Sequence, residues 1–168
     1  MSSNILLLSA HPNIGGSKAC AAMLEAVKEL KNVKVVDIYN TPLEVENYID
    51  DVKNADVLVF QFPFWWGSAP GRLKDWLDTF MLGFKENPGM KGKKLLVATT
   101  TGVAAEEYHA GGAEGFTIDE ILRPYQVTAM YSGMTYLRPF AIYGTMMPDA
   151  EERIAEGSKA YKALLETL

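Results

Sequence analysis

The chain has one cysteine, Cys20, and only two histidines among its 168 residues. A single cysteine excludes an intrachain disulfide framework and favours a reducing compartment. So few histidines and cysteines leave a zinc site without its usual ligands, and no His-Glu-x-x-His motif occurs, so we expect no resident metal. Cys20 itself is expected on a helix, as a small buried residue rather than as a nucleophile.

Basic tracts and long apolar runs are also missing. Lysine and arginine number 16 and aspartate and glutamate 21, a net charge of −5 that argues against a general nucleic-acid binder. The uncharged stretch 57–71 contains Pro63, Gly67 and Pro70 and is too short and too interrupted for a transmembrane helix. Residues 1–4 lack the basic start of a secretory signal. These absences predict a cytoplasmic protein that does not span a membrane.

The composition favours one globular domain over residues 1–168. With 48% hydrophobic and 22% charged residues, the chain can build a core and is not intrinsically disordered. Five apolar runs alternate with segments of helical periodicity, and the predicted strands are 4–10, 33–38, 57–62, 95–99 and one within 136–143. This alternation predicts an α/β fold with a five-stranded parallel sheet, for which the strand order 2-1-3-4-5 is suited to this length.

Cap and breaker residues mark the predicted helices. Ser17 and Ser68 are candidate N-caps, and residues 117–120 match a capping box. Pro124 is expected to interrupt the helix that follows, and Gly133 to end its continuation.

Three loops of unusual composition follow the first, third and fourth predicted strands. Ligands of open parallel sheets bind beyond the carboxyl ends of the strands, which selects 11–17, 63–67 and 100–115. The first loop precedes a helix N-terminus, where free amides favour an anion such as phosphate. The hydroxyl of Ser17 and a charged His11 are candidates for the same anion, and an ordinary capped turn is the alternative. No Gly-x-Gly-x-x-Gly or Walker A motif occurs, which disfavours a Rossmann NAD site and a P-loop.

The second loop places Phe64, Trp65 and Trp66 together at a strand end. Aromatic side chains give flat apolar walls, and loop backbone groups can bond the edge of a planar heteroaromatic ring. Taken singly, each tryptophan is expected in the core or in an interface. The cluster at this position favours a ligand or a subunit contact.

The third loop begins Thr100-Thr101-Gly102, whose hydroxyls and backbone suit a polar ring edge. A hydroxyl from Tyr108 can stabilise negative charge that develops on a bound ring. A histidine such as His109 can transfer a proton near neutral pH. The alternative is a flexible glycine-rich loop whose tyrosine packs on its own stem.

The same loops resemble those of the flavodoxin-like NAD(P)H:quinone oxidoreductases. The chain looks closest to the short bacterial members that act as ancillary oxidoreductases of glutathione-gated potassium efflux. The shared stretches are Ala10-His11-Pro12 with Ser17, Gln61-Phe62-Pro63-Phe64-Trp65-Trp66-Gly67-Ser68-Ala69-Pro70, Leu73-Lys74 with Trp76-Leu77-Asp78, Thr100-Thr101-Gly102, Leu122-Arg123-Pro124-Tyr125-Gln126 and Leu137-Arg138-Pro139-Phe140-Ala141. They cover nearly the whole chain in order. The resemblance implies a flavodoxin-like three-layer sandwich and a homodimer with its active site at the subunit interface.

Roles for individual residues also follow from the resemblance. Tyr108 is the catalytic candidate, over the reactive face of the flavin. The cofactor-binding candidates are His11, Ser17 and Ala19 at the phosphate and Pro63, Phe64, Trp65, Trp66, Gly67, Thr100, Thr101 and Gly102 at the ring. NAD(P)H would give a hydride to the flavin and leave before a quinone-like acceptor binds. The chain length favours FMN, with FAD as the alternative.

Three residues depart from the family pattern, and one of them, Glu114, leaves the proton supply and the choice of acceptor open. Val103 stands where a second glycine is common, Glu114 where an active-site histidine is common, and Cys20 where many members have asparagine. Two other functions remain as alternatives: an electron carrier like flavodoxin, and a regulatory subunit that docks on a potassium-efflux transporter. An apolar dimer interface could imitate such a docking surface, and its candidate methionines are Met81, Met130 and Met134.

Overall fold

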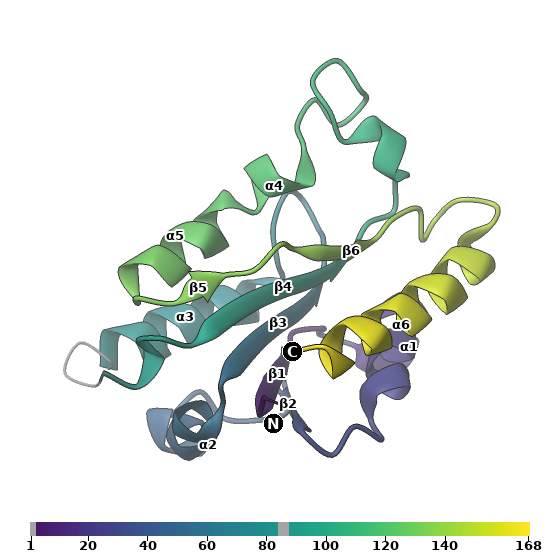
Figure 1. The fold of residues 1–168 in the computed structure, drawn as a ribbon. Helices are drawn as coiled ribbons and strands as arrows, with labels where there is room; N and C mark the ends of the chain where they lie inside the picture. The colour runs from purple at the N-terminus through teal and green to yellow at the C-terminus, as the bar shows by residue number, and fades with distance from the viewer. Residues whose placement is uncertain (1–2, 84–87) are drawn as a thin grey trace.

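The computed structural model describes residues 3–83 and 88–168, so Met1 and Ser2, half of the segment that argued against a secretory signal, lie outside it. One parallel sheet forms the centre of the molecule, with the order β2-β1-β3-β4-β5 and with β6 also beside β4 (Figure 1). Its strands are β1 (Ile5–Ser9), β2 (Val33–Asp37), β3 (Val57–Pro63), β4 (Lys94–Thr100), β5 (Thr135–Tyr136) and β6 (Phe140–Ile142). The predicted α/β class and the order 2-1-3-4-5 are confirmed.

Helices cover both faces of this sheet (Figure 1). One face carries α1 (Ala19–Val27) and α6 (Ala150–Glu166), and the other carries α2 (Ile49–Asn54), α3 (Gly71–Gly83) and α5 (Arg123–Tyr131). The remaining helical turns are the short α4 (Ile118–Ile121) and the 3-10 turns η1 (Ile14–Gly16), η2 (Val45–Asn47), η3 (Pro88–Met90) and η4 (Ala105–Glu107). None of the helices in the described ranges has the length and apolar character needed to cross a bilayer.

The apolar run of β3 supplies a core on each face of the sheet. Val57 and Val59 pack with the residues of α1 and α6, whereas Leu58, Phe60 and Phe62 pack with those of α3 and α5. Successive strand side chains point to opposite faces, so only an unbroken apolar run can serve a sheet covered on both sides.

The fifth strand is broken into two short segments. β5 pairs with the start of β4, and β6 pairs with its end. Between them Leu137 still donates its N–H to the carbonyl of Leu95 at 2.8 Å, but Pro139 has no N–H with which to continue the ladder. The prediction of one strand within 136–143 is therefore only partly right.

Helix ends test the predicted caps. Thr117 and Glu120 form the predicted capping box at α4, α5 begins with Pro124 in its first turn, and Gly133 follows its end with φ of 68°. Ser17 does cap α1, because its Oγ accepts the N–H of Cys20 at 3.1 Å, although the N-cap position itself is one residue later. Ser68 is not a cap: α3 begins three residues further on, and Ser68 closes a turn with Trp65.

We predict that Gly157→Ala lowers the free energy of unfolding. A Cβ at Gly157 of α6 would lie 2.7 and 2.8 Å from Cγ1 and Cδ1 of Ile142 in β6. We expect a loss of about 1–2 kcal/mol in urea denaturation, although alanine gains up to about 1 kcal/mol in helix propensity. Ile142→Val removes Cδ1 and should lessen the cost in the double variant. Gly71→Ala, which has no atom within 4 Å of the new Cβ, is the control and should be neutral or stabilising. Equal effects of the two alanine variants would contradict the close contact.

Candidate functional site

The three predicted loops meet at the carboxyl edge of the sheet, above which residues 101–117 rise (Figure 1). The N–H of Phe64 donates to the carbonyl of Thr100 at 2.9 Å. The rings of His11 and Trp65 meet edge to face with centroids 5.3 Å apart, and those of Phe64 and Tyr108 with centroids 6.3 Å apart. The structure thus brings together candidates from all three loops.

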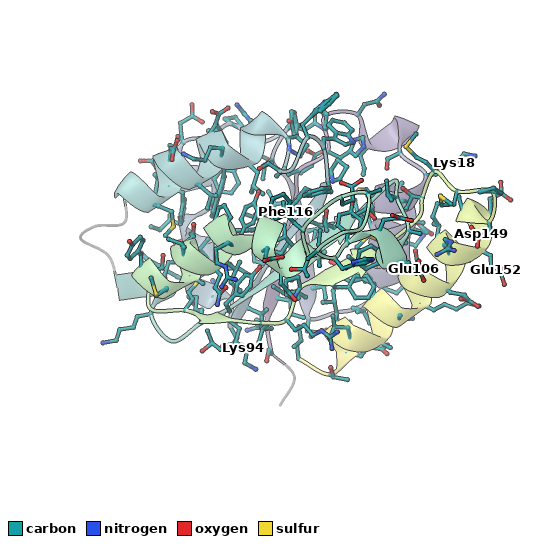
Figure 2. All side chains as sticks on the ribbon, turned by 90° about the horizontal axis from the view of Figure 1, so that it is seen from above. Lys18, Lys94, Glu106, Phe116, Asp149 and Glu152 are labelled. Carbon is teal, nitrogen blue, oxygen red and sulfur yellow. The ribbon has the colours of Figure 1, made fainter. Side chains whose placement is uncertain are left out.

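The first loop presents hydrogen-bond donors at the start of α1, where Lys18 is labelled in Figure 2. Among the described residues, the N–H groups of Lys18 and Ala19 have no acceptor. The Ser17 oxygen accepts from Cys20, which leaves its own hydrogen free to donate. Two amides and a hydroxyl at a helix N-terminus are the donor set that a phosphate requires.

His11 is neutral rather than charged in this environment. Its side chain is buried, and its Nδ1 accepts the N–H of Asn13 at 3.0 Å, which assigns the ring hydrogen to Nε2. Burial lowers the pKa of His11, and the negative charge of Asp37 opposes this only in part. The lowered pKa favours a neutral His11, whose Nε2–H remains a donor, and a charged His11 beside a bound anion stays a prediction.

The second loop is strained and open to solvent. Trp66 is fully exposed with φ of 51°, Gly67 follows with φ of 78°, and Trp65 is 45% exposed. Trp65 and Trp66 therefore do not pack in the core, and of the two places expected for them the interface remains a prediction. A non-glycine residue in the left-handed region costs on the order of 1 kcal/mol and is kept mostly where a site needs it. The N–H groups of Trp66 and Gly67 have no acceptor among the described residues.

The first residues of the third loop are hydrogen-bonded to Thr145, which the sequence did not single out as a site residue. Thr101 is buried, and its carbonyl accepts both the N–H and the hydroxyl of Thr145, at 2.9 and 3.0 Å. A Cβ on Gly102 would lie 2.8 Å from the sulfur of Met146, so a larger residue here would displace the exposed Met146 side chain. Thr145 follows β6 at the same edge of the sheet, and the strand-end rule would have found it if applied to the fifth strand.

Tyr108 is buried between two other rings. Its ring contacts Phe64 and, at 5.5 Å between centroids, Tyr143. Burial raises the pKa of Tyr108 and the negative charge of Glu114 raises it further, against an opposing hydrogen bond with Thr101. Tyr108 therefore keeps its proton at neutral pH and can donate it in a hydrogen bond.

His109 is not brought to this site. It is exposed, and its Nδ1 lies 2.9 Å from the carbonyl oxygen of Ala110, its own neighbour. The loop around it is folded rather than structureless, since Gly112 donates to the carbonyl of His109 and Ala113 to the carboxylate of Glu107. This arrangement holds Glu114, not His109, toward Tyr108.

A cavity of about 430 Å³ opens between the second and third loops. It is lined by Phe64, Gly67, Glu114, Phe116, Glu120 and Ile121. The last four lie between the end of the third loop and the end of α4. The sequence had singled out Glu114 as a departure from the family pattern and Glu120 only as part of a capping box, and it had not singled out Phe116 and Ile121. A larger groove of about 590 Å³ lies between α3 and α5 and meets the site only at Ser68 and Ala69. Over residues 3–83 and 88–168, no three acidic, histidine or cysteine side chains are grouped to hold a metal ion.

We predict that His11 titrates below the ordinary histidine range. Because its pKa is lower in the folded than in the unfolded chain, its contribution to stability is present above about pH 6.5 and falls as the pH drops below that value. Nitrogen NMR of the ligand-free chain should show the Nε2–H tautomer, with a midpoint below 6.5. His109→Gln assigns the two signals, because the chain has no third histidine. A midpoint above 6.5 for His11 would contradict the neutral state described here.

Comparison with known proteins identifies the family of this chain. The family model for the flavodoxin-like fold matches residues 3–165. The NAD(P)H oxidoreductase YrkL of Bacillus subtilis is 36% identical over 92% of this chain and 97% of that protein. The potassium-efflux ancillary protein KefG of Pectobacterium atrosepticum is 33% identical over 94% of this chain and 90% of its own length.

Two solved structures extend the comparison. The general stress protein 14 of Treponema denticola, in complex with FMN, superposes with a TM-score of 0.89 at 29% identity over 98% of both chains. A protein from P. pentosaceus described as an NADPH-quinone reductase superposes with a TM-score of 0.84 at 28% identity over 100% of this chain and 99% of that one. The resemblance to NAD(P)H oxidoreductases and efflux ancillary proteins is confirmed, and the chain belongs to the flavodoxin-like fold family.

Proposed function

We propose that residues 1–168 form a single flavin-binding domain that oxidises NAD(P)H and reduces a quinone-like acceptor by a ping-pong mechanism. The observation that carries this proposal is the meeting of unpaired donors, exposed aromatic rings and the buried Tyr108 at one edge of the sheet. The names of the oxidoreductase and quinone-reductase relatives support the same activity. The proposed location is the cytoplasm, where the unpaired Cys20 would stay reduced.

The donor set fits FMN. Ser17, Ala19 and the Nε2–H of His11 would hold the phosphate. The polar atoms of the ring would accept from the N–H groups of Trp66, Gly67 and Gly102, which have no acceptor within residues 3–83 and 88–168. Pro63, which pairs with Thr100 across β3 and β4, and Thr101, which is bonded to Thr145, would fix the loops that carry these groups. The FMN complex of the Treponema denticola protein supports FMN as the cofactor. When bound, a flavin accepts a hydride from NAD(P)H and passes the electrons to an acceptor.

Tyr108 would act as a fixed donor over the reactive face. Its ring is held between Phe64 and Tyr143, so its hydroxyl has little freedom to turn away. Because burial keeps it protonated, the hydroxyl would donate a hydrogen bond to an oxygen that gains negative charge during acceptor reduction.

The proposed assembly is a homodimer that uses the groove between α3 and α5. Met130 and Tyr131 are exposed beside this groove, which Met81 and Tyr131 line. Met134, the third methionine suggested for this surface, is 8% exposed and belongs to the core instead. Sedimentation velocity at micromolar concentration should give a dimer, and a monomer would contradict this assembly.

Binding to a potassium-efflux transporter is a second candidate function. The observation that favours it is the similarity to the ancillary proteins KefG and KefF, at 33% and 32% identity. Specific binding to such a transporter that persists in catalytically inactive variants would support this function. If no such binding is found, only the enzymatic function remains.

The test of the enzyme is an anaerobic titration. Protein loaded with FMN should lose its visible flavin absorbance when NADPH or NADH is added and regain it with a quinone. Retained flavin that neither donor bleaches would favour an electron carrier. FAD is tried in parallel, and binding of neither flavin would contradict the proposal.

Within this assay, Tyr108→Phe should slow quinone reduction about tenfold or more while FMN affinity changes little, because one hydrogen bond to a developing charge is lost. Tyr143→Phe is the matched control, since it keeps an aromatic ring packed against Tyr108 and removes a hydroxyl to which the proposal gives no role. Equal turnover of Tyr108→Phe and the wild type would remove Tyr108 from the mechanism.

Ser17→Asp tests the phosphate end. Aspartate can still accept the N–H of Cys20, so α1 should begin as before. Its charge would repel a phosphate, and we expect FMN affinity to fall by about tenfold or more. Riboflavin, which has no phosphate, should bind both proteins equally. Equal FMN affinity would place the phosphate elsewhere.

A further inference from the structure

The cavity between the second and third loops, beside the proposed flavin site, is lined by aromatic rings and by acidic side chains. Phe64 and Phe116 face it, and its charged lining residues are Glu114 and Glu120, with no lysine or arginine. The whole segment 101–121 contains five acidic residues and no lysine or arginine. A planar ring can pack against these phenylalanines, and the negative charge of the glutamates acts on charged substituents of that ring.

Glu114 is held firmly in this position. Its N–H donates to the carbonyl of Glu107 at 3.2 Å, and the preceding N–H donates to the Glu107 carboxylate at 2.9 Å. A turn from Gly112 to Gly115 closes the segment, and Gly115 has φ of 73°. The carboxylate is close enough to Tyr108 to act on the titration of its hydroxyl. No described cation lies within ion-pair distance of Glu114.

Glu120 has a smaller influence on a ligand. Its carboxylate accepts both the N–H and the hydroxyl of Thr117 at 2.8 Å, and the positive charge of Arg123 acts on it. Part of its field is therefore already compensated within the protein. Glu114 is therefore the lining residue whose negative charge acts most strongly on a ligand in the cavity.

From this geometry we infer that Glu114 makes the acceptor site select by charge: aromatic acceptors that are cationic or uncharged are reduced in preference to anionic ones. The inference rests on the proposed function, since it assigns the acceptor to this cavity. It deepens that function by naming the substrate class and the residue that sets it. Solvent at the open cavity limits the effect, and salt should weaken it further.

The experiment compares three naphthoquinones that carry a sulfonate, no charge or a quaternary ammonium group at the same ring position. In ping-pong kinetics, kcat/KM for each acceptor is measured independently of the donor. Glu114→Gln should lower the ratio of kcat/KM for the cationic to the anionic quinone about threefold to tenfold, since one nearby charge is removed. Glu114→Lys should lower it further and favour the anion. Raising the ionic strength should shrink the ratio in the wild type and leave Glu114→Gln nearly unchanged.

Glu106→Gln is the matched control, with the same change of net charge on the same loop. Figure 2 shows Glu106 well apart from Phe116, and Glu106 acts on Arg153 of α6 instead. We expect its ratio to stay within about twofold of the wild type, because exposed charges at longer range are screened. Equal ratios in Glu114→Gln and Glu106→Gln, or a uniform change for all three quinones in Glu114→Gln, would overturn the inference.

A binding measurement separates this inference from the proposed function. If the wild type reduces no quinone, the proposed function fails, and the Kd values of a naphthalene quaternary ammonium salt and of a naphthalenesulfonate are then decisive. They are read from the tryptophan fluorescence of the purified chain, to which the exposed Trp66 contributes. Tighter binding of the cation that is lost in Glu114→Gln supports charge selection, and equal binding of both probes contradicts it.

Discussion

The register between β3 and β4 is the constraint on which the rest of the molecule depends. Seven residue pairs join the two strands, and the ladder runs on through the bond from the N–H of Phe64 to the carbonyl of Thr100. Thr99 adds a bond from its hydroxyl to the carbonyl of Phe62 at 2.7 Å. A slip of one residue would turn every core side chain of β3 to the wrong face and would separate the aromatic loop from the threonine loop. The same pairing therefore sets the core and assembles the site.

The main features of the fold could be predicted because they depend on local pattern. Unbroken apolar runs separated by helical periodicity lead to a parallel sheet covered on both faces, and the capping box at Thr117 and the stop at Gly133 are local signals. The predictions of the fifth strand and of the cap at Ser68 failed because tertiary contacts determine the structure there. Pro139 interrupts the fifth strand, yet the segments before and after it, β5 and β6, both pair with β4. Ser68 matches a cap by composition, but the tight turn with Trp65 uses its backbone instead.

The site was predictable to a lesser extent. The strand-end rule found three loops that do meet, because parallel strands place their carboxyl ends at one edge. It could not show that Trp66 is exposed, that burial keeps His11 neutral, or that His109 turns away, since each depends on distances across the fold. Thr145 went unnoticed because the strand-end rule was applied to the first, third and fourth strands but not to the fifth.

The two halves of the site differ in rigidity, and this difference bears on how a cofactor would bind. Thr100 and Thr101 are buried and their carbonyls are paired, so the floor of the site exists before any ligand arrives. Trp65 and Trp66 leave apolar surface in water, and Trp66 adopts a costly backbone conformation. A planar ring placed between floor and wall would remove that surface from water at about 25 cal/mol per Å². The exposed tryptophans would then supply affinity, while the buried threonines and Tyr108 would orient the ring.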